Sequence, residues 1–540
     1  MPHRVLATLS EHKVDIIGFI ASCVVGGIFL WLITPPGFIL GVSSYWDTQL
    51  EDIAQYISGY RAYMAAPWSL PLLRIPSLNW PHGTTVTFVD AIPVFAFAIK
   101  LVDPLLPIPH NPYGVWVLFC FALQGGSAWF LSRQVVGRNY LLAALGVALC
   151  IMMPSLSARM GHLSLQAHFI LLIALGLYFR GQRLERRQTV LWTLLLVFAF
   201  YTNFYLTAMT TALMLASAAD RTLRTRRLVD MSFCAIPLLA VVITVPLTLG
   251  TAFGSAVPDT GFGFYSMNLL APVAEGHLLA MPFYEPGTAG QYEGYNYLGL
   301  GLIILTVFAL VQARTKVAGE FHRFGPFLVA ILILCVVYAL SNEVYLSNVH
   351  LLHWQVPGSL VSLFEAFRSS GRFFWVVSYA LVVFALFGLK HMSGLSRGLI
   401  VFGVLVIQLA DLVPIYVDIK DSLDREPNIL ADIPAWKLAL DGVETIHAFP
   451  KFKCPGGYAR EVLPLQMVAA EGGYNLTTGF ISRYGADCDA VAEEIAASDP
   501  LIAAYVFAHT HYTDDQIQSF LTPEAQCQRL EIWTVCRIQP

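Results

Sequence analysis

The sequence predicts a polytopic α-helical membrane protein with about eleven transmembrane helices and a small C-terminal α+β domain. The chain of 540 residues has a mean hydropathy of +0.62 and only 13% charged residues, whereas a soluble domain averages about 25%. Its apolar runs are long enough to cross a bilayer, which takes about 20 residues. After residue 417 these runs shorten and the charge rises, which indicates a separate domain.

Eleven apolar segments are expected to cross the membrane. The first is not expected to be a cleaved signal peptide, because it is long and no clear small-residue cleavage site follows it. The prolines within and after residues 91–102 predict an interfacial or re-entrant helix there. The segments 190–201 and 205–219 are short and can also form one broken helix pair around residues 201–205. The expected spans are 14–34, 112–132, 139–153, 163–179, 190–201, 205–219, 231–250, 297–313, 325–340, 373–389 and 397–416.

The orientation follows from charge, because short loops rich in Lys and Arg stay in the cytoplasm. This rule places the N-terminus inside and the C-terminal domain outside, with external loops at 35–111, 251–296 and 341–372. The membrane domain then covers residues 1–417. The basic clusters lie at 4–13, 133–138, 180–187, 221–227, 314–323 and 390–397.

Residues 418–540 are predicted to form the α+β domain. They hold 18 acidic and nine basic residues, a net charge of −9 against −4 for the whole chain. Helical spacing occurs at 430–441, 487–497 and 514–521, and strand patterns at 445–449, 501–508 and 530–538. Four cysteines allow two disulfides in three pairings, and a zinc site lacks a CxxC motif. These are Cys454, Cys488, Cys527 and Cys536, of which the last two flank a turn and are our first choice of partners.

Acidic residues in the first external loop are the candidate catalytic groups. The segment 44–63 reads as an amphipathic helix on the membrane surface. Asp52 or Asp47 in it could act as a general base or hold a divalent cation, or could simply favour a helix start. Arg61, in the same segment, is a candidate for substrate binding. Asp90 is either a helix N-cap or a second acid of the site.

Two arginines just before an external span entry are candidates for phosphate binding. Arg368 and Arg372 flank Ser369-Ser370-Gly371, and arginine binds phosphate in a bidentate manner. The alternative is that Arg372 only anchors the end of the span, with Trp375 in the aromatic belt.

Further polar residues at the outer face are expected to bind a sugar or a phosphate. His162 and His168 are six residues apart, which is not the i, i+4 spacing of a helical metal pair. Polar groups at membrane depth often mark substrate paths. The loop 251–296 is either a lid or an inert cap, and it supplies the candidates Tyr265, Asn268 and Glu293.

Several function classes lack support. The sequence has no G-x-x-x-x-G-K-[ST], dinucleotide fingerprint, H-E-x-x-H or G-x-S-x-G motif, so nucleotide hydrolysis and zinc protease chemistry are not indicated. A net acidic chain without a basic extramembrane domain also argues against binding of nucleic acid.

At these motifs the chain resembles the GT-C superfamily of multi-span glycosyltransferases. More closely, it looks like a largely uncharacterised bacterial membrane-protein family placed with them. The resemblance covers the membrane part and not the tail. It is carried by residues 52–63, 87–93, 161–168, 263–272, 292–299 and 367–375.

The resemblance implies a GT-C-like fold in a bacterial inner membrane, with the C-terminal domain in the periplasm. It implies inverting transfer of a sugar from a polyprenyl-phosphate donor to a glycan, lipid or protein acceptor, with membrane lipids around the protein. An external-loop Asp is then the base, which maps to Asp52 or Asp47. No cofactor is certain, and a divalent cation, Mg or Mn, would be held by these two residues. The order Glu51-Asp52 reverses the adjacent Asp-Glu pair of protein mannosyltransferases, which leaves the acceptor open.

Three alternatives remain at this point. A lipid-linked-sugar flippase or transporter would need polar residues at mid-span depth. A glycan ligase or polymerase with a polyprenyl-diphosphate donor would differ only in its substrate. A non-catalytic assembly protein would act through the tail.

Overall fold

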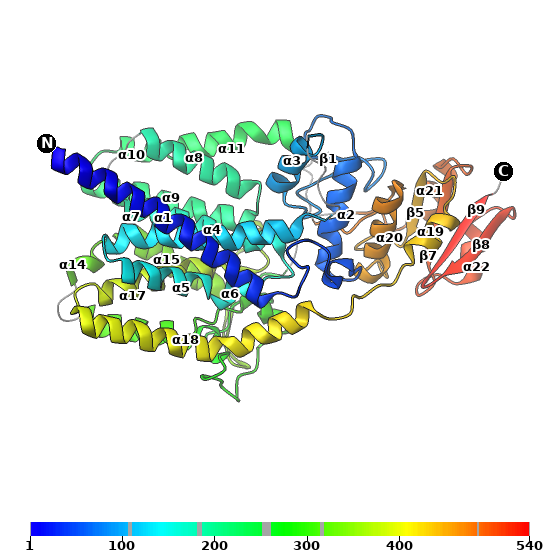
Figure 1. The fold of residues 1–540 in the computed structure, drawn as a ribbon. Helices are drawn as coiled ribbons and strands as arrows, with labels where there is room; N and C mark the ends of the chain where they lie inside the picture. The colour runs from blue at the N-terminus through cyan, green and yellow to red at the C-terminus, as the bar shows by residue number, and fades with distance from the viewer. Residues whose placement is uncertain are drawn as a thin grey trace.

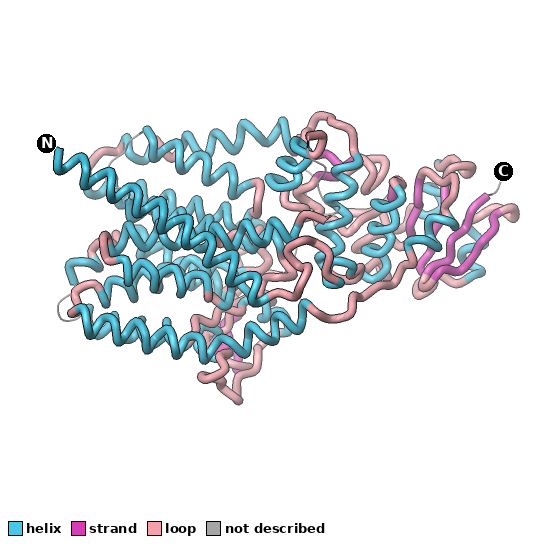
Figure 2. The backbone as a smooth tube through the Cα atoms, viewed as in Figure 1, coloured by secondary structure: helices cyan, strands magenta, loops and turns pink. Residues whose placement is uncertain are grey.

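The computed structural model describes residues 2–105, 111–180, 186–250, 261–313, 318–482 and 485–538. A bundle of long helices makes up most of the molecule, and the C-terminal sheet domain sits at one end of it (Figure 1). The N-terminus lies at the opposite end of the bundle. Figure 2 shows that most of the strand structure belongs to the C-terminal domain.

Seven helical segments in the described part of the chain are long and apolar enough to cross a membrane. They correspond to seven of the predicted spans, and the protein is therefore a polytopic membrane protein. The segments are Lys13–Ile33 in α1 (Pro2–Ile33), α4 (Tyr113–Val136), Tyr140–Ser157 with α5 (Tyr140–Ile151) and α6 (Pro154–Ser157), Leu163–Arg180 with η2 (Leu163–Gln166) and α7 (Phe169–Arg180), Val229–Thr248 with α10 (Val229–Ser232) and α11 (Ala235–Thr248), Ser370–Leu389 with η5 (Ser370–Phe373) and α17 (Phe374–Leu389), and α18 (Gly394–Leu423).

The other four predicted spans are helices that do not meet the same criteria. Helices α8 (Arg186–Phe200), α13 (Leu300–Ala313) and α15 (Pro326–Leu340) are apolar but only 14 or 15 residues long, about 21 Å at 1.5 Å per residue. Helix α9 (Phe204–Thr225) is longer but less apolar. A total of eleven spans therefore stays a prediction. Of the predicted cytoplasmic clusters and external loops, residues 106–110, 181–185, 251–260 and 314–317 lie outside the described residues.

The connection between α8 and α9 is a tight turn at residues 201–203. Asn203 caps α9, and its side-chain oxygen accepts a hydrogen bond of 2.9 Å from the Tyr205 amide. Polar N-cap residues satisfy amide groups that have no partner within the helix. The break predicted around residues 201–205 is thus a turn between two packed helices, and it lies at the end of the bundle that faces the tail.

The first loop differs from its prediction. The predicted helix 44–63 is split into η1 (Ser44–Asp47) and α2 (Asp52–Ala65). Helix α2 is not an exposed amphipathic helix, because ten of its 14 residues are buried. It lies between the bundle and the tail, packed against α20 (Ala459–Gly472). The prediction failed because the tail covers the face that the sequence pattern assigned to solvent.

The rest of the first loop consists of short strands and one short helix. The antiparallel pair β1 (Arg74–Ile75) and β2 (Thr84–Thr85) is followed by α3 (Pro93–Val102). Helix α3 has ten residues, about 15 Å, too short to cross a bilayer. The later loops carry small elements: α12 (Ala271–Ala274), η3 (Ala289–Gly294), α14 (Ala318–Phe321), β3 (Glu343–Leu346), β4 (Val349–His353), η4 (Gly358–Leu360) and α16 (Val361–Phe364).

The tail domain, residues 424–538, is built on a five-stranded sheet of order β6-β5-β7-β9-β8. The pairs β5–β6 and β5–β7 are parallel, and β9 is antiparallel to both of its neighbours. The predicted boundary at 417 falls inside α18, which continues to Leu423. The elements are α19 (Ile433–Ala439), β5 (Thr445–Phe449), α20, β6 (Asn475–Leu476), α21 (Val491–Ala497), β7 (Ala503–Ala508), α22 (Asp514–Phe520), β8 (Ala525–Leu530) and β9 (Trp533–Ile538).

Two disulfide bonds cross-link the tail domain. Cys454 is bonded to Cys488, and Cys527 is bonded to Cys536. The second bond links the neighbouring antiparallel strands β8 and β9, where these two cysteines face each other in register. Disulfides are typical of proteins exposed to an oxidising compartment.

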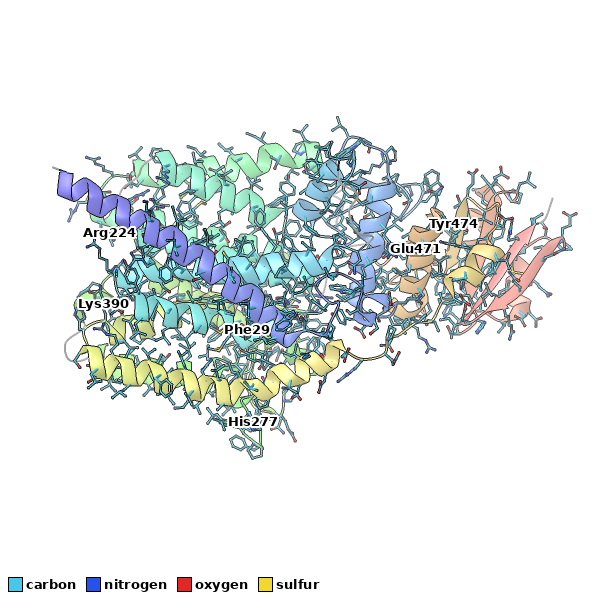
Figure 3. The ribbon with its side chains drawn as sticks, in the orientation of Figure 1. Phe29, Arg224, His277, Lys390, Glu471 and Tyr474 are labelled. Carbon is cyan, nitrogen blue, oxygen red and sulfur yellow. A yellow bond between two sulfur atoms is a disulfide. The ribbon has the colours of Figure 1, made fainter. Side chains whose placement is uncertain are left out.

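The tail is joined to the first loop by backbone hydrogen bonds. The Leu476 amide donates to the Ser77 carbonyl at 2.8 Å, and the amides of Asn79 and Trp80 donate back to the Thr478 and Leu476 carbonyls. One apolar core runs from the bundle into the inner face of the tail sheet. Figure 3 places Glu471 and Tyr474 near this junction, and Arg224 and Lys390 at the far end of the bundle. The tail is therefore a fixed part of the structure.

Candidate active site

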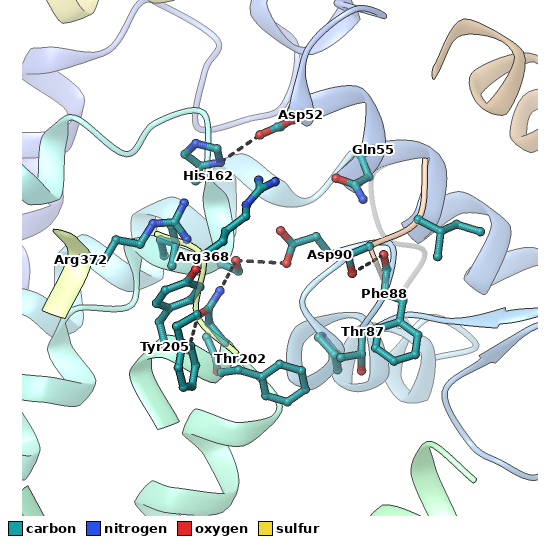
Figure 4. Close-up of a pocket in the computed structure, with 18 of the residues that line it drawn as sticks. Asp52, Gln55, Thr87, Phe88, Asp90, His162, Thr202, Tyr205, Arg368 and Arg372 are labelled. Carbon is teal, nitrogen blue, oxygen red and sulfur yellow. Dashed lines mark hydrogen bonds and ion pairs between the residues drawn. The ribbon is translucent and has the colours of Figure 1, made fainter. Parts of the chain in front are cut away.

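A cavity of about 270 Å³ lies where the bundle, the first loop and the tail meet (Figure 4). The first loop contributes Asp52, Gln55 and the segment 87–93, and the bundle contributes the segment 162–165, the α8–α9 turn and residues 365–372. The tail closes another side. The lining residues are Asp52, Gln55, Thr87, Phe88, Asp90, Pro93, His162, Ser164, Leu165, Phe200, Thr202, Asn203, Phe204, Tyr205, Glu365, Ala366, Phe367, Arg368, Arg372, Phe452, Lys453, Phe480, Ile481 and Ser482.

Asp52 and His162 form an ion pair at the cavity. Asp52 is the first residue of α2, and its Oδ2 lies 3.1 Å from Nδ1 of His162. The Asp52 side chain is 42% exposed, so one face of the carboxylate stays open to a substrate. The other ring nitrogen of His162 lies 3.4 Å from Oε1 of Glu293. The imidazole thus connects an exposed carboxylate to a buried one.

Glu293 is the centre of a buried ion cluster behind His162. Its Oε2 accepts from Nη1 of Arg159 at 2.6 Å and from Nε of Arg372 at 3.1 Å, and its Oε1 accepts from Nη2 of Arg372 at 2.8 Å. Burial alone would raise the pKa of Glu293, but Arg372 and Arg159 outweigh it and hold that pKa well below its usual range. Two arginines bound by one carboxylate leave a fixed positive charge beside the cavity.

Asp90 is the second carboxylate of the cavity. Tyr56 donates to its Oδ2 at 3.2 Å and Ser164 donates to its Oδ1 at 3.3 Å. Asn203 donates to the Ser164 hydroxyl at 2.9 Å, which ties the α8–α9 turn to this network. Burial raises the pKa of Asp90, and His162 opposes that shift. The N-cap reading of Asp90 is wrong, because α3 is capped by Ile92.

Arg368 belongs to the same cavity. Figure 4 shows its side chain extending between His162 and Asp90. Its guanidinium carbon lies 5.2 Å from the centre of the Tyr265 ring, within the range of a cation–π contact. Arg368 and Arg372 therefore lie together at the cavity, as the sequence suggested, but Arg372 is already bound to Glu293.

Six predicted site residues are absent from the cavity lining. Two of them, Glu293 and Tyr265, lie directly behind it in contact with Arg372 and Arg368, and the other four lie elsewhere. Asp47 ends η1 and is exposed to solvent. Arg61 is ion-paired with Glu471 of α20 and joins the tail to α2. His168 is buried, with its ring centre 4.2 Å from that of Trp375. Asn268 is also buried, and it donates to Gln291 and to the Ser347 carbonyl. The last three residues hold the fold in place through these contacts.

The predicted divalent cation has no ready site here. Within the described residues, no group of three or more His, Cys, Asp or Glu side chains is placed to hold a metal ion. Of the two expected ligands, Asp52 lines the cavity and Asp47 does not. The divalent cation stays a prediction, and the proposed reaction does not use one.

Sequence reasoning missed much of the cavity. Tyr56 and Ser164 lie within the segments 52–63 and 161–168, but their hydrogen bonds to Asp90 depend on the packing of segments far apart in sequence. The contribution of the tail had no sequence signal at all. It comes from Phe452, Lys453 and residues 480–482.

A family described as "Domain of unknown function (DUF6311)" matches residues 23–413, and its "DUF6311 C-terminal domain" matches residues 435–538. No curated protein matches the chain. Among solved structures, the cryo-EM structure of the arabinofuranosyltransferase AftD from mycobacteria is similar, with a TM-score of 0.45 and 13% identity over 90% of this chain. The match spans 40% of the length of AftD. By the match over most of its length, the chain belongs to the DUF6311 family.

Proposed function

We propose that the protein is a membrane glycosyltransferase that moves a sugar from a polyprenyl-phosphate-linked donor to an acceptor hydroxyl. The observation that carries the proposal is one cavity with two carboxylates, Asp52 and Asp90, facing two arginines, Arg368 and Arg372. Carboxylates serve as general bases toward hydroxyl groups, and arginines stabilise a departing phosphate.

The proposed reaction is a single displacement. Asp52 takes the proton of the acceptor hydroxyl, and the acceptor oxygen attacks the anomeric carbon of the donor. The bond from that carbon to the phosphate oxygen breaks, and the lipid phosphate leaves with the bonding electrons, which inverts the anomeric centre. Arg368 would bind the leaving phosphate, while the charge of Arg372 is fixed beside it by Glu293. Asp90 would orient a sugar hydroxyl.

The distribution of basic residues supports an external site. Arg224 and Lys390 lie at the end of the bundle opposite the tail (Figure 3), and cytoplasmic loops carry an excess of such residues. The cavity would therefore face the periplasm of a bacterial inner membrane, where a lipid-borne donor meets a water-borne acceptor.

A transporter is less well supported, because the buried polar groups at the far end of the bundle serve the fold. Asp220 in α9 accepts from the Tyr178 hydroxyl at 2.7 Å. It also accepts from the amides of Phe327 and Leu328 at the start of α15. These contacts cap a helix, so they do not form part of a polar path.

The test uses the full-length protein in lipid nanodiscs with a panel of radiolabelled undecaprenyl-phosphate sugars, and water serves as the acceptor in place of the unidentified hydroxyl. We expect release of undecaprenyl phosphate by the wild type, and a loss of about 10²–10⁴-fold in Asp52→Asn. Asp90→Asn should also be slow. Asp47→Asn is the matched control, because Asp47 is an acid of the same loop outside the cavity, and it should keep wild-type turnover. Equal turnover by the wild type and both cavity variants would overturn the proposal.

A further inference from the structure

The tail domain supplies one wall of the candidate active site. Phe452, Lys453 and Phe480 line the cavity together with the acids of the first loop. The proposed reaction uses only groups of the membrane part and gives these three residues no role. Their side chains nevertheless face the same space.

Phe480 is held in place from two sides. Its amide donates to Oε1 of Gln466 at 2.7 Å, and its carbonyl accepts from Nε2 of Gln55 at 2.8 Å. Gln466 also donates to Oγ of Ser58 at 2.8 Å. Gln55 lies three residues after Asp52 on α2. The helix that starts with the candidate base therefore also fixes the aromatic wall.

Phe452 and Lys453 are presented by a stapled turn. The Phe452 amide donates to the Thr478 hydroxyl at 2.9 Å, and Cys454 is bonded to Cys488. Lys453 has φ +66°, a left-handed conformation that non-glycine residues adopt only when the surroundings enforce it. The turn holds this lysine, which is exposed, at the rim of the cavity.

The two phenylalanine rings form one aromatic surface. Their centres are 4.6 Å apart with an interplanar angle of 49°, and both side chains are half-buried. The face of an aromatic ring is electron-rich and attracts partly positive groups. The C–H groups on one face of a sugar ring are such groups. Nζ of Lys453 lies 5.8 Å from the centre of the Phe452 ring, where it can donate to sugar oxygens.

We propose that Phe452, Phe480 and Lys453 form the acceptor subsite, and that the acceptor is a carbohydrate chain. This proposal rests on the proposed function. The donor phosphate is assigned to the arginines of the bundle wall, so the wall supplied by the tail is available for the other substrate. The tail lies beyond the ends of the apolar helices (Figure 1), so its ligand reaches it from water. The Phe480 carbonyl is bonded to Gln55, one turn of α2 after Asp52, so a sugar stacked on the two rings lies near the candidate base.

The test is saturation-transfer NMR on the full-length protein in nanodiscs with maltoheptaose, mannopentaose and hexagalacturonate as probes. We expect binding of at least one probe, weakened about five- to tenfold by Phe452→Leu or Phe480→Leu, as for a lost aromatic contact. Phe452→Tyr should retain binding, and Lys453→Met should weaken it. Trp68→Leu and Lys437→Met are controls, because Trp68 and Lys437 are exposed and outside the cavity lining. Binding that is absent for every probe, or unchanged in both leucine variants, overturns the subsite.

A second readout separates this proposal from the proposed function. Hydrolysis of the undecaprenyl-phosphate sugar by water needs Asp52 but not the aromatic wall. Intact hydrolysis in Phe452→Leu together with unchanged probe binding would refute the subsite alone. A wild type that binds the probes through the two rings but hydrolyses no donor would refute the transferase.

Discussion

Nδ1 of His162 lies 3.1 Å from Oδ2 of Asp52. Nε2 of the same ring faces Glu293, so only the doubly protonated imidazole can donate to both carboxylates. Burial lowers the pKa of His162, but the hydrogen bonds with Asp52 and Glu293 outweigh it and raise that pKa above its usual value of 6.5. The positive ring orients Asp52 at the mouth of the cavity.

We predict that this pair makes stability depend on pH. Because the pKa of His162 is raised on folding, its stabilising contribution is fully present below the unfolded value of about 6.5. The contribution is lost as the pH rises through the folded pKa. The difference in Tm between wild type and His162→Gln should therefore be larger at about pH 5.5 than at about pH 9. Thermal unfolding in detergent measures it.

The control for this prediction is His82→Gln. His82 is exposed in the first loop, outside the cavity lining, and its replacement should not change the pH profile. A difference between wild type and His162→Gln that grows with pH would contradict a charged His162.

The long apolar helices and part of the tail were predictable, because both depend on local periodicity, whereas α20, β6 and β8 were not predicted. The seven long apolar helices and the strand at 445–449 follow directly from runs of residues that are close in sequence. Helix α20 was hidden by Pro464 in its middle, since proline normally disfavours a helix interior. The split of the helix at 44–63 depends on the contact with the tail, which local pattern does not record.

The candidate site was predictable only as a list of residue types. Asp52, Asp90 and Arg368 were chosen from polar clusters, and the structure brings them to one cavity. Asp47 has the same local signal as Asp52, because both are acids near the start of a helical segment. Which of them faces the cavity is decided by the break at residues 48–51, and this is a property of the folded chain.

We predict that Glu293→Gln is among the most destabilising single changes at the site. The Glu293 side chain is 2% exposed and lies between Arg159 and Arg372. Its loss leaves two buried positive charges without their counterion, which costs about 3–5 kcal/mol. Thermal unfolding should show a large drop in Tm, and Glu285→Gln, at an exposed acid of the same loop, should show almost none.

A double variant tests the cause. If the cost comes from uncompensated charge, Arg372→Met should be partly tolerated in the Glu293→Gln background, and the two changes should not be additive. The lowered pKa of Glu293 also determines how its stabilising contribution changes with pH. Its contribution is present above an unfolded pKa of about 4.3 and is lost as the pH falls below that value. Additive losses in the double variant would rule out the charge cluster as the source.

We predict that Gln466→Leu loosens the tail from the first loop. The Gln466 side chain accepts from the Phe480 amide and donates to Ser58. Its loss leaves the Phe480 amide without this acceptor, while the Ser58 hydroxyl still donates to the Ala54 carbonyl. A buried donor without a partner costs about 1–3 kcal/mol. Hydrogen exchange should become faster at residues 476–482 and stay unchanged in the bundle.

The matched control for the tail is Gln528→Leu. Gln528 is an exposed residue of β8, so this change should not alter exchange at residues 476–482. Equal exchange in Gln466→Leu and wild type would show that the backbone bonds to residues 77–80 hold the tail without this side chain.

Finally, we predict that the two disulfides stabilise the tail but differ in their effect on the site. Their sequence separations are 34 and 9 residues, which correspond to about 4 and about 3 kcal/mol of stabilisation by loop closure. Replacing either pair with serine should therefore lower the Tm. Only the double variant Cys454→Ser with Cys488→Ser releases the turn that carries Phe452 and Lys453. Only this variant should therefore also weaken binding of an oligosaccharide probe.

The double variant Cys527→Ser with Cys536→Ser is the control, because the bond that it removes links β8 to β9 away from the cavity. Equal loss of probe binding in both variants would assign the effect to general unfolding of the tail and contradict a specific role of the turn.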